Sequence, residues 1–344
     1  MRSAYLGIDI GSTSVKCVLL DKESRIIDSV YMKNKGIVES VIECLGKLEK
    51  DVEISACGIT GSGRNFTNVL VGGDVVKTEV LAHSIAALAY YPQVRTIFEI
   101  GGEDCKLMII EDAVLNNFNM NNICAGGTGA MIEAIASRMG IAIEDVGELA
   151  SQSNNQLELP GKCGIFCQSA VVNKLNTGVN KSDILMGVCR ALIRNYLTIC
   201  KGNKLEPPYI FQGATAQNKA LVKALEEELG YPVIVPEQCA LMGAIGIAMM
   251  AMEEMPDKTK FKGFDAIISG RYEVRHFQCA DCANRCEVVQ VYQNNKLAGC
   301  IGSRCYKWDN ANFLYQKDKG LLHSCDTAKS QSLKSSVPQE FSVS

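Results

Sequence analysis

Apolar and polar residues follow two periodicities along the chain up to about residue 255. Short apolar runs bounded by Gly, Pro or polar residues predict strands, and they fall at 53–60, 208–212 and 232–235. Longer segments with apolar residues every three or four positions predict helices, and they fall at 38–48, 79–89, 127–139, 167–175, 184–200 and 217–229. Alternating strands and helices predict an α/β fold.

One strand–turn–strand pattern occurs twice. Residues 7–20 are GIDIGSTSVKCVLL, and residues 98–110 are FEIGGEDCKLMII. In both segments an acidic residue is followed by Ile-Gly, four further residues and a Lys. Each segment therefore predicts a β-hairpin with a glycine-containing turn. The repeat predicts a duplicated fold, in which two equivalent halves face a shared cleft.

Two apolar segments bear on targeting and membrane binding. The N-terminal MRSAYLGIDIG has one basic residue, and Asp9 interrupts its apolar run, so it predicts a first strand and no signal peptide. The longest apolar stretch, 240–252, is too short to span a membrane and predicts a buried core helix. We therefore expect a protein that does not bind a membrane.

Charge and cysteine content narrow the function. The net charge of −3 and the pI near 5.8 disfavour nucleic-acid binding. The chain contains 16 cysteines. Without a secretory signal, this number favours a reducing cytoplasmic location and metal or redox chemistry over disulfide bonds.

The composition changes after residue 255 and predicts a modular chain. Residues 1–255 are expected to form the two-lobed α/β protein. Residues 265–310 hold five cysteines and the single Trp, which predicts a small Cys-rich metal-binding module. Residues 317–344 are rich in Ser, Lys and Gln and predict a flexible tail.

The first hairpin is a candidate phosphate site. Gly11 allows close approach of the backbone, and Ser12 and Thr13 add hydroxyl groups to the backbone N–H donors of the turn. Asp9 can hold Mg²⁺ through water, and Lys16 can add positive charge.

The second hairpin offers the opposite wall of the same site. Gly101 and Gly102 allow close approach to phosphates, while Glu99, Glu103 and Asp104 can bind Mg²⁺ or the attacking water. Either hairpin alone is also compatible with a purely structural turn. The duplication favours a nucleotide phosphate site.

A third element predicts the adenosine wall. Residues 211–218, FQGATAQN, form a strand, a Gly turn and a helix start, with Gly213 and Ala214 at the turn. Gly243, in the segment LMGA, completes this wall. The predicted site thus takes ATP with Mg²⁺.

Two cysteines lie at glycine-marked helix starts. Cys124 is in NNICAGGTG, and Cys163 is in GKCGIFCQS. Backbone N–H groups and the positive end of a helix dipole stabilise a thiolate-ligated iron–sulfur cluster. Since one chain offers two such thiols and a 4Fe-4S cluster takes four, a homodimer sharing one cluster satisfies the ligand count. The alternative is that both are small buried hydrophobic residues.

The C-terminal cysteines form a second block. Cys279, Cys282, Cys286, Cys300 and Cys305 have the close spacing of metal ligands, with His276 as a spare ligand. Three interpretations remain open: a structural metal such as Zn²⁺, a second Fe–S cluster for electron transfer, and unligated thiols.

These motifs resemble those of a known family. The chain is similar to the superfamily that joins acetate and sugar kinases, heat-shock chaperone ATPases and actin. Within it, residues 4–252 resemble the BadF/BadG/BcrA/BcrD-type ATPases, which include 2-hydroxyacyl-CoA dehydratase activators and ATP-binding subunits of benzoyl-CoA reductase. The matching segments are GIDIGSTSVK, TGSGR at 60–64, EVLAHSIAA at 79–87, EIGGEDCK, NNICAGGTGAMIE and GKCGIFCQS.

The chain departs from the family pattern in two motifs. Where the family has DIGGQDSK, this chain has Glu99, Glu103 and Cys105 at the first, fifth and seventh positions. Where the family has GGVAxN, this chain has QGATAQN. The helix at 79–87 carries Glu79 and His83 one turn apart, and His83 is either a cleft residue or an ordinary hydrogen-bonded helix residue.

The resemblance implies an ATP-dependent electron donor. It implies a homodimer with a bridging 4Fe-4S cluster held by Cys124 and Cys163, loaded by a ferredoxin or flavodoxin. The electron would pass to an iron–sulfur dehydratase or reductase, such as a 2-hydroxyacyl-CoA dehydratase. Two alternatives remain: a sugar or carboxylate kinase of the same fold, and an ATP-binding regulatory protein whose cysteines bind only zinc.

Overall fold

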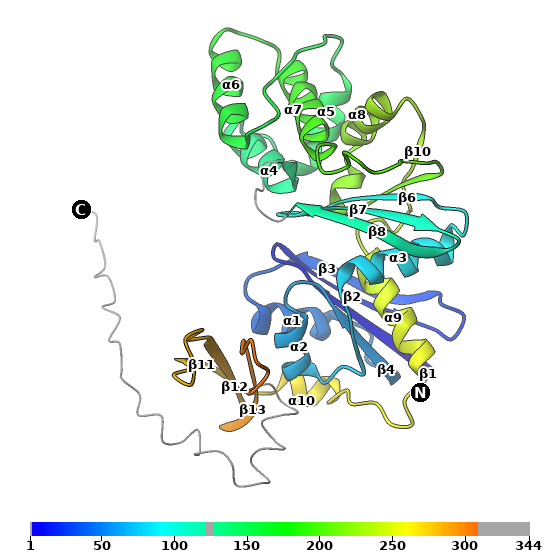
Figure 1. Ribbon diagram of the computed structural model, residues 1–344, viewed down its shortest axis with the longest axis vertical. Coiled ribbons are helices and arrows are strands. Elements are labelled where there is room, and N and C mark those ends of the chain that lie inside the picture. The colour runs from blue at the N-terminus through cyan, green and yellow to red at the C-terminus, as the bar shows by residue number, and fades with distance from the viewer. Residues whose placement is uncertain (1, 122–126, 309–344) are drawn as a thin grey trace, which may run out of the picture. The chain divides into compact units, whose positions relative to one another are not determined.

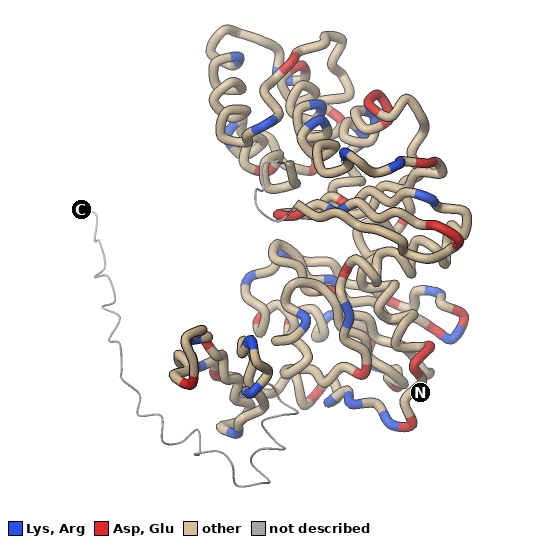
Figure 2. The backbone as a smooth tube through the Cα atoms, viewed as in Figure 1, with Lys and Arg blue, Asp and Glu red and all other residues tan. Residues whose placement is uncertain are grey.

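The computed structural model describes residues 2–121 and 127–308 (Figure 1). The chain divides into two compact units, Met1–Tyr272 and Glu273–Ser344. Within the first unit, Lys and Arg are interspersed with Asp and Glu, and no large area of one sign is seen over the described residues (Figure 2). The predicted tail at 317–344 and Cys124 lie outside the described residues.

The first half of unit 1 is built on a five-stranded sheet of order β3-β2-β1-β4-β5. Strands β1 and β2 form the predicted hairpin, and β3 extends it in antiparallel pairing. Strands β4 and β5 run parallel to β1 on its other side. The bounds are β1 Arg2–Ile10, β2 Ser14–Leu20, β3 Ile26–Lys33, β4 Val52–Thr60 and β5 Val75–Val76.

The second half repeats this topology. Its sheet has the order β10-β9-β6-β7-β8, with β6 and β7 as the antiparallel hairpin, β8 beside β7, and β9 parallel to β6. Strand β10 is parallel to β9. The bounds are β6 Thr96–Ile100, β7 Cys105–Glu111, β8 Val114–Asn121, β9 Tyr209–Gln212 and β10 Val233–Ile234. The predicted duplication is therefore confirmed.

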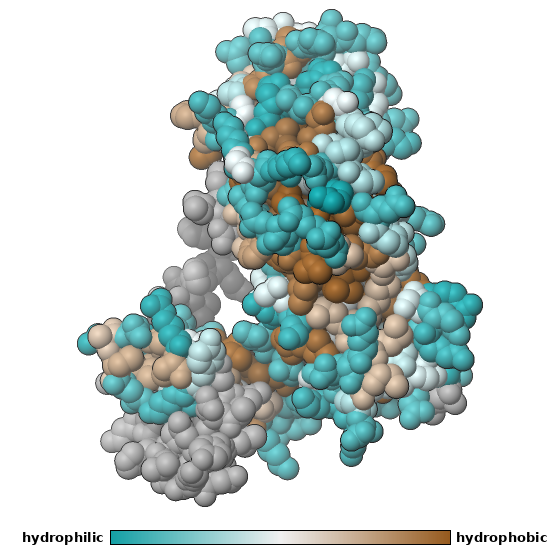
Figure 3. All heavy atoms as spheres, turned by 45° about the vertical axis from the view of Figure 1, so that its right-hand side comes forward, coloured by the Kyte–Doolittle hydropathy of each residue, from teal (hydrophilic) through white to brown (hydrophobic). Residues whose placement is uncertain are grey.

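Two helices, α3 (Glu79–Tyr90) and α9 (Met242–Glu254), lie between the two sheets (Figure 1). They share one hydrophobic core with residues of both sheets, and apolar atoms gather over this region in Figure 3. A Cβ at Gly246 of α9 would lie 1.8 Å from the carbonyl oxygen of Ala82. The missing side chain thus lets α9 approach α3 closely. The apolar stretch at 240–252 is a buried helix, as predicted, and within the described residues no helix is long and apolar enough to cross a membrane.

The remaining helices of unit 1 pack around the two sheets and against one another (Figure 1). In the first half these are α1 (Ile37–Lys47), α2 (Arg64–Val71) and α10 (Phe264–Ile268). In the second half they are α4 (Gly129–Arg138), α5 (Val146–Ser151), α6 (Gly164–Asn176), α7 (Lys181–Tyr196) and α8 (Lys219–Leu229), with short 3₁₀ helices at Ile143–Asp145 and Ala214–Gln217. The Asn180 and Asn218 side chains cap α7 and α8, which fixes both helix starts.

The second unit contains a three-stranded sheet of order β11-β12-β13. Its strands are β11 (Tyr272–Gln278), β12 (Glu287–Gln293) and β13 (Lys296–Ile301), and β12 and β13 form a hairpin. The turn residues Asn294 and Asn295 both have positive φ, at 51° and 62°. This is the backbone that a two-residue hairpin turn requires. A small core forms around Cys279, Val288 and Cys300.

Candidate nucleotide and cluster site

The two hairpins place equivalent acidic and basic residues opposite each other. Asp9 pairs with Lys16 across β1–β2, and Glu99 pairs with Lys106 across β6–β7. Lys16 Nζ lies 3.2 Å from Asp9 Oδ2, and Lys106 Nζ lies 3.0 Å from Glu99 Oε2. Both acids are buried, at 5% exposed each. The repeat in sequence is therefore a repeat in geometry.

Each pair belongs to a longer polar row. On the parallel side, Asp9 is in register with Thr60 of β4, and Glu99 is in register with Gln212 of β9. The rows are thus Thr60–Asp9–Lys16 and Gln212–Glu99–Lys106. Parallel strands direct their carboxyl ends to one edge of the sheet, which is where ligands bind in open α/β sheets.

The electrostatics of the rows keep both lysines charged. Burial alone would lower the pKa of Lys16, but the neighbouring Asp9 carboxylate outweighs it and raises this pKa above the usual lysine value. Burial also opposes the charge of Lys106, and Glu99 and Asp104 together raise its pKa well above the usual value. Lys106 Nζ lies 2.8 Å from Asp104 Oδ1. Two fixed positive charges therefore lie behind the two turns.

The turns themselves come into contact. A Cβ placed on Gly102 would lie 2.1 Å from Thr13 Oγ1, so only glycine lets the second turn approach the first. The turns are closed by Gly11 N–H to the Ser14 carbonyl and by Gly101 N–H to the Asp104 carbonyl, each at 2.9 Å. Ser12 and Glu103 are exposed at the tips of their turns. The structure brings the two predicted phosphate turns together.

The predicted adenosine wall borders the same turns. Gly213 has a φ of +89°, and a Cβ there would lie 2.5 Å from the Ile100 carbonyl oxygen. The next residue, Ala214, starts a 3₁₀ helix. Thr215 Oγ1 donates to the Ile100 carbonyl oxygen over 2.6 Å. On the other side, a Cβ on Gly243 would lie 2.8 Å from Asp9 Oδ2. All three predicted elements therefore meet at one place.

Helix α4 is hydrogen-bonded to the second turn. Gly129 N–H donates to the Gly101 carbonyl over 2.9 Å, and Ala130 N–H donates to the Gly102 carbonyl over 2.8 Å. Thr128 Oγ1 donates to the same Gly102 oxygen over 2.8 Å. The segment that precedes α4 carries Cys124. The phosphate turn is thus attached to the start of the helix that follows a predicted cluster ligand.

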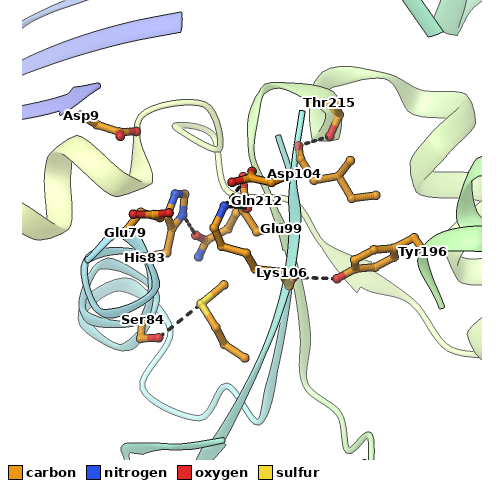
Figure 4. Close-up of polar contacts among 12 residues, drawn as sticks. Asp9, Glu79, His83, Ser84, Glu99, Asp104, Lys106, Tyr196, Gln212 and Thr215 are labelled. Atoms are coloured by element: carbon orange, nitrogen blue, oxygen red, sulfur yellow. Dashed lines mark hydrogen bonds and ion pairs between the residues drawn. The ribbon is translucent and has the colours of Figure 1, made fainter. Parts of the chain in front are cut away.

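His83, for which the sequence left a cleft role and an ordinary helix role open, lies beside Gln212, which the sequence did not single out. His83 of α3 donates from Nδ1 to Gln212 Oε1 over 2.6 Å. Figure 4 shows Gln212 between His83 and the Glu99–Lys106 pair, with Glu79 beside His83. Arg64 Nη1 lies 3.7 Å from Glu79 Oε2. The available signal was the polar Gln212 at the end of the otherwise apolar strand YIFQ.

Cys163 occupies a helix start, as the sequence predicts. It is the N-cap residue of α6, is partly exposed, and makes no side-chain capping hydrogen bond. The two residues that follow Gly164, Ile165 and Phe166, are 74% and 68% exposed. By contrast, Cys167 is fully buried in the core, and burial raises its pKa to about 11. Cys163 is therefore accessible in a way that Cys167 is not.

The C-terminal cysteines have mixed environments. Cys279 and Cys300 are buried, Cys286 is half-buried, and Cys282 and Cys305 are exposed. Cys279 Sγ accepts from Trp308 Nε1 over 3.3 Å, and Cys286 Sγ accepts from the Arg304 backbone N–H over 3.5 Å. Over residues 2–121 and 127–308, no three His, Cys, Asp or Glu side chains are gathered in a form that could hold a metal ion. The metal assignment for this block stays a prediction.

The duplicated sheets, the central helices and the paired turns define a nucleotide-binding protein of the actin-like ATPase fold. Solved structures share this fold, including the ethanolamine utilization protein EutJ of Carboxydothermus hydrogenoformans, at a TM-score of 0.52 and 16% identity over 72% of this chain and 89% of that chain. Residues 6–251 match the model of the BadF/BadG/BcrA/BcrD ATPase family. The chain belongs to this family, and ATP is its nucleotide.

Several proteins that are similar to this chain are activators of CoA-substrate dehydratases. The chain is 30% identical to the (R)-2-hydroxyglutaryl-CoA dehydratase activating ATPase of Acidaminococcus fermentans, over 72% of this chain and 97% of that protein. The crystal structure of that dehydratase's component A superimposes with a TM-score of 0.68 at 28% identity, over 74% of this chain and 99% of that chain. The activator of 2-hydroxyisocaproyl-CoA dehydratase from Clostridium difficile, solved with bound ADPNP, has a TM-score of 0.68 and 27% identity. The match covers 73% of this chain and 95% of that chain.

Proposed function

We propose that this protein is an ATP-dependent electron donor that activates an iron–sulfur dehydratase or reductase acting on a CoA thioester. Its relatives include activators of 2-hydroxyacyl-CoA dehydratases. They also include one of the benzoyl-CoA reductase subunits of Thauera aromatica, at 22% identity over 65% of this chain and 82% of that protein. The observation that carries the proposal is the accessible Cys163 at the start of α6, beside exposed Ile165 and Phe166.

The residues of the cleft fit ATP and Mg²⁺. Gly102 and Gly243 let Thr13 and Asp9 approach where a Cβ would collide with them, and the two turns lie next to the charged Lys16 and Lys106. Asp9 and Glu99 supply the carboxylates that Mg²⁺ prefers, directly or through water. Bound Mg²⁺ neutralises phosphate charge in phosphoryl transfer. Glu103 and Asp104 lie on the second turn and could bind Mg²⁺ or the attacking water.

The donor set at Cys163 fits a shared 4Fe-4S cluster. Its thiol is uncapped and partly exposed, and the N-terminal N–H groups of α6 lie beside it. Such N–H groups stabilise the negative charge of a thiolate-ligated cluster. Two protomers, each giving Cys163 and Cys124, supply the four thiolates of one cubane. The exposed Ile165 and Phe166 would be covered by the second protomer.

The hydrogen bonds at α4 supply the coupling. Thr128, Gly129 and Ala130 all bond to the carbonyl groups of the second phosphate turn. A nucleotide that moves this turn also moves the start of α4 and the Cys124 segment before it. ATP shifts the protein toward the closed form only in so far as it binds that form better. Hydrolysis then returns the protein to its open form, so that phosphoryl transfer determines when the electron is donated.

Anaerobic purification tests the proposal. We expect a brown homodimer with about four irons, reducible by ferredoxin or flavodoxin. Cys163→Ala and Cys124→Ala should lose the iron and keep nucleotide binding, while Cys167→Ala, one turn further along α6, should keep it. A parent protein that carries zinc and no iron would instead indicate a regulatory ATP-binding protein. Stoichiometric phosphorylation of a sugar or carboxylate would indicate a kinase.

A further inference from the structure

The chain between β3 and α1 contacts both halves of unit 1. Strand β3 ends at Lys33, and α1 begins at Ile37. Asn34, which follows β3, is hydrogen-bonded to the first phosphate turn, whereas Lys33 is paired with Glu133 of α4 in the second half. We call Lys33 and Asn34 the β3 corner. The β3 corner joins the first phosphate turn to the helix whose start is bonded to the second turn.

Asn34 holds the first phosphate turn at two carbonyl groups. Its backbone N–H donates to the Thr13 carbonyl oxygen over 2.9 Å. Its side-chain Nδ2 donates to the Gly11 carbonyl oxygen over 2.8 Å. The two carbonyl groups stand on either side of Ser12 in the chain. The backbone of the turn therefore cannot change its conformation without losing bonds to Asn34.

The other side of the Asn34 amide is fixed by α1. Its Oδ1 accepts from the Gly36 backbone N–H over 2.9 Å and from the hydroxyl of Ser40 over 3.3 Å. Ser40 is fully buried. A backbone N–H only donates and the Gly11 carbonyl oxygen only accepts, so exchanging the nitrogen and oxygen of the amide would break both contacts. The donor side of the amide therefore faces the turn.

Lys33 and Glu133 form an ion pair between the two halves. Lys33 Nζ lies 2.6 Å from Glu133 Oε1, and the side chains are 73% and 52% exposed. The hydrogen bond and the charge of Glu133 raise the pKa of Lys33, and the charge of Glu144 acts in the same direction. Exposed ion pairs shift an equilibrium by no more than about fivefold and are weakened by salt. Such a contact can form and break as the halves move.

We propose that Asn34 is a positioning residue for nucleotide binding, which holds the first phosphate turn in its binding conformation, and that the Lys33–Glu133 pair transmits the position of this turn to α4. This inference rests on the proposed nucleotide site. A turn that is fixed in advance loses less conformational freedom when it binds its ligand. Because the start of α4 is bonded to the second turn, a nucleotide that brings the two turns together acts on α4 from both halves.

Asn34→Asp tests the positioning role. The carboxylate keeps an acceptor for Gly36 and Ser40, and it replaces the donor to the Gly11 carbonyl by a second acceptor. We expect the Kd for ADP, measured by calorimetry, to rise at least about tenfold.

The matched control is Asn119→Asp. Asn119 of β8 also donates from Nδ2 to a backbone carbonyl, that of Ile199, over 3.0 Å. This variant loses the same kind of hydrogen bond outside both phosphate turns. Its Tm should fall about as far as that of Asn34→Asp, while its Kd for ADP should stay within about twofold of the parental value.

An exchange of charges tests the link to α4. Lys33→Glu places two carboxylates together, and Glu133→Lys places two ammonium groups together. In each single variant, the protection from hydrogen exchange that ADP gives the amides of α4 should fall by up to about fivefold at low salt, and the double variant should restore it. At about 1 M salt, where screening acts within about 3 Å, the single variants should approach the parent. Lys47→Glu, which breaks the exposed pair with Glu43 inside α1, is the control and should leave this protection unchanged.

The positioning role is overturned if Asn34→Asp binds ADP like the parent. It is also overturned if Asn119→Asp loses ADP affinity to the same extent, because that pattern describes a general loss of stability. The link to α4 is overturned if the double variant stays as impaired as the single variants. A parent in which ADP protects no amide of either turn overturns the proposed nucleotide site and, with it, this inference.

Discussion

Thr128 Oγ1 and the carbonyl oxygen of Gly102 are joined by a hydrogen bond of 2.8 Å. Thr128 is fully buried and is the N-cap residue of α4, and Gly102 belongs to the second phosphate turn. The bond connects the predicted second phosphate turn with the helix that follows Cys124 in the sequence. We predict that this bond is part of the route by which the nucleotide site acts on the cluster site.

Thr128→Val should weaken this connection. The substitution keeps the volume and removes one hydrogen bond, a net change of about 1 kcal/mol, or roughly a fivefold shift in a two-state equilibrium. ATP-dependent electron transfer to the acceptor should fall by about that factor, with iron content unchanged. Transfer is measured in an anaerobic assay with and without ATP. The control is Thr177→Val, at an exposed threonine after α6. Equal ATP-dependent electron transfer by Thr128→Val and the parent would contradict the predicted route.

Gly102→Ala should block the approach of the two turns. Its Cβ would lie 2.1 Å from Thr13 Oγ1, which forces one turn to move. We expect ADP affinity or kcat for ATP hydrolysis to fall at least about tenfold, which is about 1.4 kcal/mol. The two are measured by calorimetry and by phosphate release.

The matched control for this change is Gly46→Ala. Gly46 lies in α1, and a Cβ there meets nothing within 4 Å. Since Ala is a better helix former than Gly by about 0.8–1 kcal/mol, this variant should be slightly more stable than the parent and equally active. If Gly102→Ala behaves like Gly46→Ala, the turns do not need to meet.

The duplicated hairpins could be predicted from the sequence alone, because glycine turns and acidic residues are local features. The sequence was less informative about β3 and β8, each of which pairs with one hairpin and forms an edge of its sheet. β8 reads VLNNFNMN, and its Asn residues have low strand propensity. Pairing with β7 overrides that preference, and pairing is a tertiary property.

The limits of the helices and the buried contact of Gln212 were also beyond local patterns. The helix predicted at 184–200 is α7, Lys181–Tyr196, because the capping Asn180 sets an earlier start. Gln212 looked like part of the adenosine turn. Its contact with His83 joins residues 129 positions apart, and no periodicity in either segment indicates it.

Lys106→Met should destabilise the second half strongly. Lys106 is 3% exposed and bonds to both Glu99 and Asp104. Removing one partner of a buried ion pair leaves an uncompensated charge and costs about 3–5 kcal/mol. Chemical denaturation at neutral pH measures the loss. A decrease below about 1 kcal/mol would show that the pair is effectively solvated.

The same lysine predicts a pH dependence. Its pKa is raised in the folded state, so its contribution to stability is fully present below the usual lysine pKa of about 10.4 and is lost only as the pH rises toward the higher folded value. The difference in unfolding free energy between the parent and Lys106→Met should therefore be constant from about pH 7 to about pH 9. A difference that shrinks across this range would contradict the raised pKa.

The cysteine block of the second unit should hold one zinc ion per chain. The described part of the unit, residues 273–308, contains all five cysteines of the block, at spacings typical of metal ligands. Its small core contains Cys279, Val288 and Cys300. Cys279 Sγ accepts from Trp308 Nε1 and donates to Asp281 Oδ2 over 3.4 Å, and Cys286 Sγ accepts from the Arg304 backbone N–H. Elemental analysis of the intact protein measures the metal.

Cysteine variants test which metal the cysteine block of the second unit binds. Cys286→Ser should lose the zinc and keep the iron of the shared cluster, whereas Cys163→Ala should lose the iron and keep the zinc. Cys239→Ser, at a buried thiol of the first unit, should keep both. Iron that persists in Cys163→Ala and disappears in Cys286→Ser would establish a second cluster in place of zinc. If the second unit binds neither metal, its cysteines act as core thiols, a role that the burial of Cys279 and Cys300 already allows.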